Sequence, residues 1–202
     1  MLTEGIGIKP PAPVAVVLTD GNMRLIAAEA KRQAEARNYN GRSDSWGKGF
    51  GISMVVGGVA LQSSESPIFV GKIGEYATAH ILTRRLGVRI EPSAEVLTGG
   101  DGGADLIVVG KVLQIKTRRS VPVSLIRVRD DRGFSVFHKC DAFVFCSWDG
   151  VRTVRILGWL KSGDVLSKQE VNARCGDHKN VEVHDSELLP FSRLVDELRL
   201  CL

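Results

Sequence analysis

An aspartate, a glutamine and a lysine stand at spacings that can bring them together: Asp105, Gln114 and Lys116. They flank or lie within two short runs of β-branched and apolar residues, 106–109 and 112–116, which predict the strands of a β-hairpin. Because side chains alternate between the faces of a strand, all three are expected on one face, with Asp105 opposite Lys116. A carboxylate and an amide oxygen are hard ligands that suit Mg²⁺, and a nearby ammonium can stabilise a phosphoryl transition state.

The turn of this hairpin is expected at Gly110 and Lys111, with Val109 paired to Val112. The opposite face is uniformly apolar and needs a core; its members are Leu106, Val108, Leu113 and Ile115. An ordinary cross-strand pair of aspartate and lysine, which stabilises a sheet modestly, is the alternative to a site. The glycines at 99, 100, 102 and 103 favour the site, because a backbone without side chains lets a phosphate or a metal approach closely.

The run Gly-Asp-Gly-Gly-Ala-Asp at 100–105, followed by Gln-Ile-Lys at 114–116, resembles the PD-(D/E)XK nuclease superfamily. It is most similar to the branch, found in Mrr-type restriction endonucleases, that carries Gln-x-Lys. The resemblance implies that Asp105 binds the metal, that Gln114 takes the place of the usual glutamate and that Lys116 is the catalytic lysine. It implies Mg²⁺ or Mn²⁺ as the cofactor, with the Ile115 backbone carbonyl as a further ligand and Asp101 as an additional candidate. The glutamine removes one negative charge from the metal site.

A second acidic candidate, Glu75, lies on a predicted helix over 71–86 that ends at Gly87. It shares an otherwise apolar stripe of this helix. In the resembled superfamily, a helix before the hairpin supplies a glutamate near the metal in a Gly-x-x-Gly-Glu-like context, and Glu75 matches that position. The alternative is a first-turn glutamate favoured by the helix dipole. His80 is close enough to approach the scissile group, or it is a partly buried helix histidine.

The net charge is +4 and the pI is about 9.0, which is compatible with a nucleic-acid partner. Arg118 and Arg119 directly follow the second strand of the hairpin, where basic groups would hold the phosphates that flank the scissile one. A solvated strand end is the alternative. The residues expected to contact DNA are Lys72, Arg84, Arg85, Arg118, Arg119 and, in a basic loop, Arg42.

The composition is that of a globular protein, with 44% hydrophobic and 25% charged residues. No apolar run is long enough to span a membrane, and no basic segment precedes the short apolar run at 14–18. Four cysteines without a CxxC spacing indicate reduced thiols in a cytoplasmic protein, and the resemblance implies a prokaryotic or phage-infected cell. A zinc site is an alternative that lacks a close cysteine pair; its candidates are His138, Cys140, Cys175 and His178.

The expected fold class is α/β, with a restriction-endonuclease-like core in which helices flank a central mixed β-sheet and the hairpin lies at its middle. Residues 67–202 are expected to form this nuclease-like domain. Residues 1–66 are expected to form an N-terminal extension with a basic loop and a helix over 23–37, capped by Asp20 or Asn22.

The expected function is metal-dependent hydrolysis of DNA phosphodiester bonds by an endonuclease of the phage, restriction or recombination and repair type. The chain could act as a homodimer. The alternative is a DNA-binding module of the same fold that has lost its activity, and RNA as the substrate is also left open.

Overall fold

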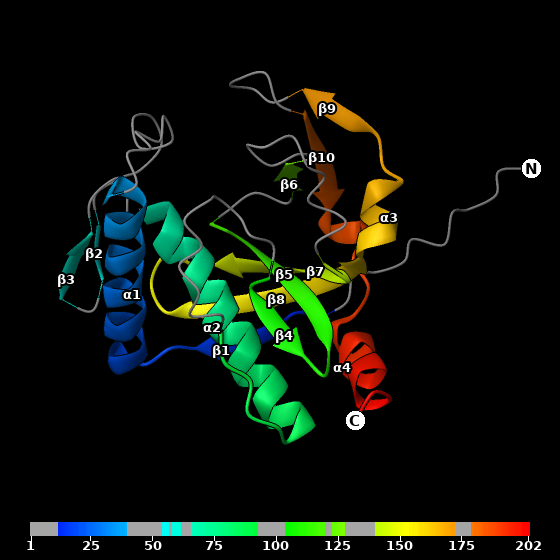
Figure 1. The fold of residues 1–202 in the computed structure, drawn as a ribbon, viewed down its shortest axis with the longest axis horizontal. Coiled ribbons are helices and arrows are strands. Elements are labelled where there is room, and N and C mark those ends of the chain that lie inside the picture. Colours follow the sequence, from blue (N-terminus) through cyan, green and yellow to red (C-terminus); the bar gives the residue numbers. More distant parts are fainter. Residues whose placement is uncertain are drawn as a thin grey trace, which may run out of the picture.

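A five-stranded mixed sheet forms the centre of the fold in a computed structural model (Figure 1). Its strands, in spatial order, are β1 (Val14–Val17), β8 (Thr153–Lys161), β7 (Ala142–Trp148), β5 (Lys111–Arg118) and β4 (Leu106–Val108). The neighbours β5 and β7 run parallel, and the other pairs are antiparallel. The residues that the structure describes are 12–39, 54–56, 58–61, 66–92, 104–119, 123–127, 140–172 and 179–202.

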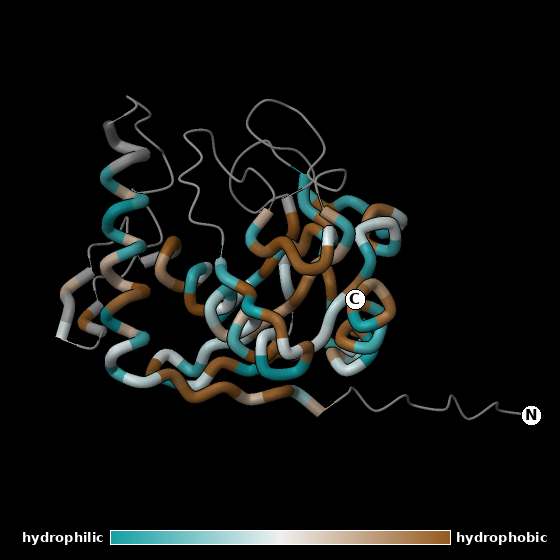
Figure 2. Tube along the Cα trace, turned by 60° about the horizontal axis from the view of Figure 1, so that its bottom comes forward, coloured by the Kyte–Doolittle hydropathy of each residue, from teal (hydrophilic) through white to brown (hydrophobic). Residues whose placement is uncertain are grey.

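Two helices pack on one face of the sheet, α2 (Ser66–Leu86) and α4 (Phe191–Arg199), and α1 (Asp20–Tyr39) packs against α2 in the same core. Strand β7 shows why the sheet has two cores. Val144 and Cys146 point to the helices, and Phe143 and Phe145 point to the other face. In Figure 2 the strands at the centre are mainly brown, as expected for a sheet that is covered on both faces.

The other face is covered by a three-stranded antiparallel sheet and a short helix. The strands are β6 (Val123–Arg127), β10 (Lys179–His184) and β9 (Glu170–Asn172), and the helix is α3 (Ser162–Leu166). A 3₁₀ turn over Asp185–Glu187 follows β10. A separate hairpin of β2 (Met54–Val56) and β3 (Val59–Leu61) completes the described elements. The predicted α/β class, with helices flanking a mixed sheet, is confirmed.

The segment before residue 67 contributes to this core. Strand β1 pairs with β8 along the edge of the main sheet, and the apolar side of α1 packs in the same core as α2.

Helix α1 begins earlier than predicted, and its cap is Thr19 rather than Asp20 or Asn22. The Thr19 Oγ1 accepts the Asn22 backbone N–H at 3.1 Å, and the Asn22 Oδ1 accepts the Thr19 N–H at 3.1 Å. Within the described residues, no helix combines the length and the apolar character needed to cross a membrane.

The β4–β5 hairpin has a different register from the predicted one. Leu106 pairs with Leu113, and the turn consists of Val109 and Gly110, whose φ angles are 50° and 76°. Positive φ is unfavourable for valine, so contacts elsewhere must select this register. One such contact is a 2.8 Å hydrogen bond from the Val112 N–H to the Asp141 Oδ2.

The register correction is by two residues, and therefore each side chain keeps its predicted face. The paired register ends at Leu106 with Leu113, and the Asp105 N–H also donates to the Leu113 carbonyl, so Asp105 does not lie opposite Lys116. The prediction that the hairpin lies at the middle of the sheet was also wrong. Strand β4 is an edge strand, and Ile107 on it is 63% exposed.

Candidate functional site

Helix α2 carries two charged side chains into the core. Lys72 and Glu75 are each only 9% exposed, and the Lys72 Nζ lies 2.7 Å from the Glu75 Oε2. A buried charge is costly unless it is paired, so this ion pair is what allows both residues to lie here. The helix begins at Ser66, five residues before the predicted start, and ends at Leu86 before Gly87, as predicted. Lys72, expected as a DNA contact, is therefore a buried partner of Glu75.

A glycine lets α2 lie directly on strand β5. A Cβ atom at Gly74 would be 1.9 Å from the Thr117 Oγ1 and 3.2 Å from the Ile115 Cγ2. A side chain at this position would push the helix away from the strand. Glu75 is the next residue, so the approach at Gly74 also determines where its carboxylate lies.

Asp105 closes the edge of β5 where β4 ends. Strand β4 has three residues and β5 has eight, so β5 extends beyond its partner. The Asp105 Oδ2 accepts the Ile115 N–H at 2.6 Å, and the Asp105 N–H donates to the Leu113 carbonyl at 3.1 Å. Since the N–H and C=O of one strand residue point to the same side, the Ile115 carbonyl faces the same edge as Asp105.

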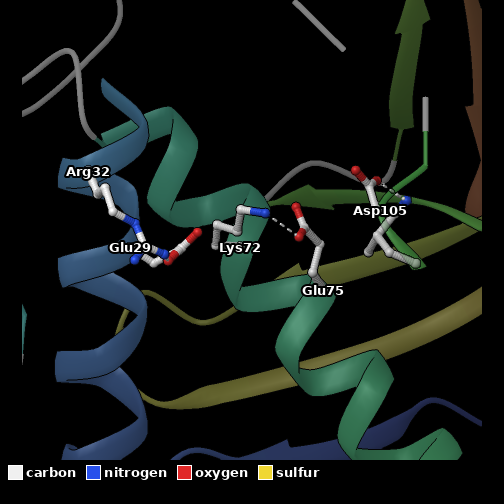
Figure 3. Close-up of polar contacts among 6 residues, drawn as sticks. Glu29, Arg32, Lys72, Glu75 and Asp105 are labelled. Atoms are coloured by element: carbon white, nitrogen blue, oxygen red, sulfur yellow. Dashed lines mark hydrogen bonds and ion pairs between the residues drawn. The ribbon is translucent and has the colours of Figure 1, made fainter. Parts of the chain in front are cut away.

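The carboxylates of Glu75 and Asp105 are electrostatic neighbours. The pKa of Glu75 is raised from 4.5 to about 7, mainly by burial and also by the nearby Asp105 carboxylate, while Lys72 opposes both effects. Figure 3 shows Lys72 between Glu29 of α1 and Glu75, with Asp105 on the other side of Glu75. Two carboxylates that repel one another at a strand edge favour a shared cation.

Gln114 adds a buried side-chain oxygen to this part of β5. Its side chain is 2% exposed, and among the described residues no donor reaches its Oε1. A buried amide oxygen without a hydrogen bond is unfavourable, and a cation ligand bond would satisfy it. The oxygens of Asp105, Gln114 and Ile115 are the type that Mg²⁺ prefers. Within the described residues, no group of three or more His, Cys, Asp and Glu side chains is placed to hold a metal. The candidate set thus relies on an amide and a backbone carbonyl.

Lys116 lies on the same sheet face as Gln114 and is partly buried. Lys116 and Asp105 have a common neighbour in Cys140, a buried residue just before β7. Burial raises the pKa of the Cys140 thiol, a contact with Ser162 lowers it, and Lys116 and Asp105 act on it with opposite signs. The lysine and the aspartate are therefore both close to this thiol. Nothing in the sequence pattern indicated that Cys140 lies beside them.

The two arginines after β5 have different environments. The Arg118 side chain is 12% exposed. Its Nη2 contacts both carboxylate oxygens of Asp185, and its Nη1 donates to the Ser124 Oγ at 3.1 Å. It connects β5 to β6 and to the 3₁₀ turn, so its guanidinium does not face solvent as a phosphate contact would. Arg119 is exposed and lies over the Trp148 ring, 5.3 Å from its centre.

The other predicted residues of α2 lie away from the carboxylates. Arg84 and Arg85 are exposed in the last turn, and Arg84 is about 14 Å along the helix axis from Glu75. His80 is exposed rather than partly buried, and five residues of helix place it about 140° around the axis from Glu75. The structure therefore does not bring these three residues to the site.

The remaining candidates lie outside the described residues; they are Arg42, Asp101 and the zinc candidates His138, Cys175 and His178. Comparison of the chain with protein-family models, with curated proteins and with solved structures finds no significant match.

The raised pKa of Glu75 predicts a pH dependence of stability. Because the folded state holds this proton more tightly, the free energy of unfolding should fall as pH rises from about 4.5 to about 7, by at most on the order of 3 kcal/mol. Urea denaturation of wild type and Glu75→Gln across this range measures the effect. As pH rises, the free energy of unfolding of wild type should fall relative to that of Glu75→Gln. Parallel pH profiles of the two proteins would contradict the prediction.

Proposed function

We propose that the chain is a metal-dependent DNA endonuclease with a restriction-endonuclease-like fold, which hydrolyses phosphodiester bonds. The observation that carries the proposal is the proximity of two carboxylates at the edge of β5: Asp105, which accepts the Ile115 N–H, and Glu75, whose pKa the Asp105 charge raises. Gln114, next to Ile115 on β5, adds a buried Oε1 that no donor reaches among the described residues. Hard oxygen donors and a nearby lysine are what phosphodiester hydrolysis with a divalent cation requires.

Mg²⁺ or Mn²⁺ would be held by the Asp105 carboxylate, the Gln114 Oε1 and the Ile115 carbonyl. When bound, the ion supplies Lewis-acid stabilisation of the phosphate and lowers the pKa of water. The Lys116 ammonium then stabilises the charge that develops on the phosphoryl oxygens and orients the attacking water. The Glu75 carboxylate, with a pKa of about 7, is suited to exchange a proton with that water near neutral pH.

DNA cleavage assays on the full chain test this proposal. Linear duplex, single-stranded, branched and plasmid DNA, with RNA beside them, are incubated with Mg²⁺, with Mn²⁺ or with EDTA. Cleavage of DNA that EDTA abolishes supports the proposal, and the preferred DNA form assigns the type of nuclease. Binding without cleavage supports the inactive DNA-binding module, which the low charge of a site with Gln114 favours. Cleavage of RNA alone overturns DNA as the substrate.

The environments of Arg118 and Arg119 predict different effects on DNA binding. Arg119→Ala should reduce the slope of log K against log salt by about one, since one phosphate contact is lost. Arg118→Ala should leave this slope unchanged and lower the free energy of unfolding by on the order of 1–2 kcal/mol, because Asp185 loses its partner.

Salt titrations of binding and urea denaturation measure the two effects. Arg193→Ala removes the same charge from an exposed position on α4 and serves as the control. A change of slope in Arg118→Ala equal to that in Arg119→Ala would show that both arginines contact DNA.

A further inference from the structure

The Lys72 ammonium already occupies a cation position beside Glu75. Its Nζ lies 2.7 Å from the Glu75 Oε2, and both side chains are nearly excluded from water. An ammonium so close to a carboxylate and shielded from solvent neutralises it far more effectively than a surface lysine would. The face of Glu75 that contacts Lys72 is thus not free for another cation.

The position of Lys72 is supported from its other side. Glu29 of α1 lies beyond it and acts electrostatically on Glu75, so the lysine lies between two acidic residues (Figure 3). Glu29 is itself paired with Arg32 on the same helix. Lys72 is buried and is enclosed where α1 and α2 pack together. To leave Glu75, its ammonium would have to cross this packed contact.

The charges of the site fit one divalent ion and not two. Among the described residues, the carboxylates nearest to this edge of β5 are Asp105 and Glu75, and Lys72 cancels one of their two negative charges. Gln114 contributes an oxygen without charge. Sites that hold two divalent ions about 4 Å apart bring four positive charges together and depend on carboxylates to balance them. Within the described residues, no cluster of three or more acidic, histidine and cysteine side chains provides this.

We propose that Lys72 takes the place of a second metal ion, so that the site binds a single divalent cation at Asp105 and Gln114. The inference rests on the proposed function. It assigns Lys72 as a positioning residue, which holds Glu75 towards the site and excludes a second ion. It differs from the role expected for this lysine from the sequence, which was contact with DNA.

Mn²⁺ binding to the full chain, without DNA, tests the inference. The signal of free Mn²⁺ in electron paramagnetic resonance gives the number of ions bound per chain. Wild type should bind one ion. Lys72→Gln, which removes the charge and keeps a side chain of similar length, should bind two. Lys168→Gln removes the same charge from an ion pair with Glu187, in the 3₁₀ turn after β10, and should still bind one.

Each outcome has a distinct meaning. Two ions in wild type would overturn the inference and leave the proposed function standing, and this result does not depend on the folding of a variant. One ion in both wild type and Lys72→Gln would also overturn the inference alone, provided that circular dichroism shows the variant folded. No ion in wild type would overturn the metal-dependent function and the inference with it. A second ion in Lys72→Gln that is lost in Lys72→Gln with Glu75→Gln would support Glu75 as its ligand.

Discussion

Asp105→Asn is expected to abolish DNA cleavage while the chain stays folded. The change removes the one carboxylate in the proposed set of Asp105, Gln114 and Ile115, and the loss of rate should be roughly 10²–10³-fold or more. Stability should fall only by about 1 kcal/mol, because the asparagine oxygen can still accept the Ile115 N–H as a neutral acceptor. Cleavage assays with Mg²⁺ and urea denaturation measure the two effects separately.

Asp141→Asn is the matched control for this prediction. The Asp141 Oδ2 accepts the Val112 N–H at 2.8 Å, so it too is a carboxylate bound to the backbone of β5. Val112 is three residues from Ile115, about 10 Å along the strand. The control variant should lose similar stability and retain cleavage. Equal losses of cleavage in both variants would show that Asp105 only supports the strand, and full activity of Asp105→Asn would contradict its role.

Gly74→Ala is expected to have the largest effect among substitutions that remove no chemical group. The new Cβ would lie 1.9 Å from the Thr117 Oγ1, which forces α2 away from β5. Such overpacking should lower the free energy of unfolding by about 1–3 kcal/mol. Cleavage should fall as well, since the adjacent Glu75 carboxylate moves with the helix, and displacements of about 1 Å can cost on the order of 100-fold in rate.

Two further variants separate packing from other effects of this change. Gly71→Ala lies on the same helix and its Cβ would meet nothing within 4 Å, so it should be neutral or stabilising by up to about 1 kcal/mol. Thr117→Ala removes the oxygen that collides with the new Cβ, and it should recover part of the stability of Gly74→Ala in the double variant. If Gly74→Ala were as stable and as active as Gly71→Ala, the close approach of α2 would not position the site.

Local sequence patterns determined the helices, most strands and the faces of the hairpin. The glycine at 87 ended α2 where expected, and the alternating residues of β5 placed Gln114 and Lys116 on one face and Leu113 and Ile115 on the other. These features depend on neighbours within a few positions along the chain. A register error of two residues left the faces unchanged, because the alternation has a period of two.

Tertiary structure decided which charged groups meet. The sequence pattern presented Lys72 and Arg118 as basic residues available to DNA. Lys72 instead lies buried against Glu75, and Arg118 binds Asp185, which is 67 positions away. The edge position of β4 and the inclusion of β1 in the sheet likewise depend on pairing between distant segments. Burial and pairing with distant residues determine whether a charged side chain is accessible to a ligand such as DNA. Neither can be read from the spacing of residues along one strand or helix.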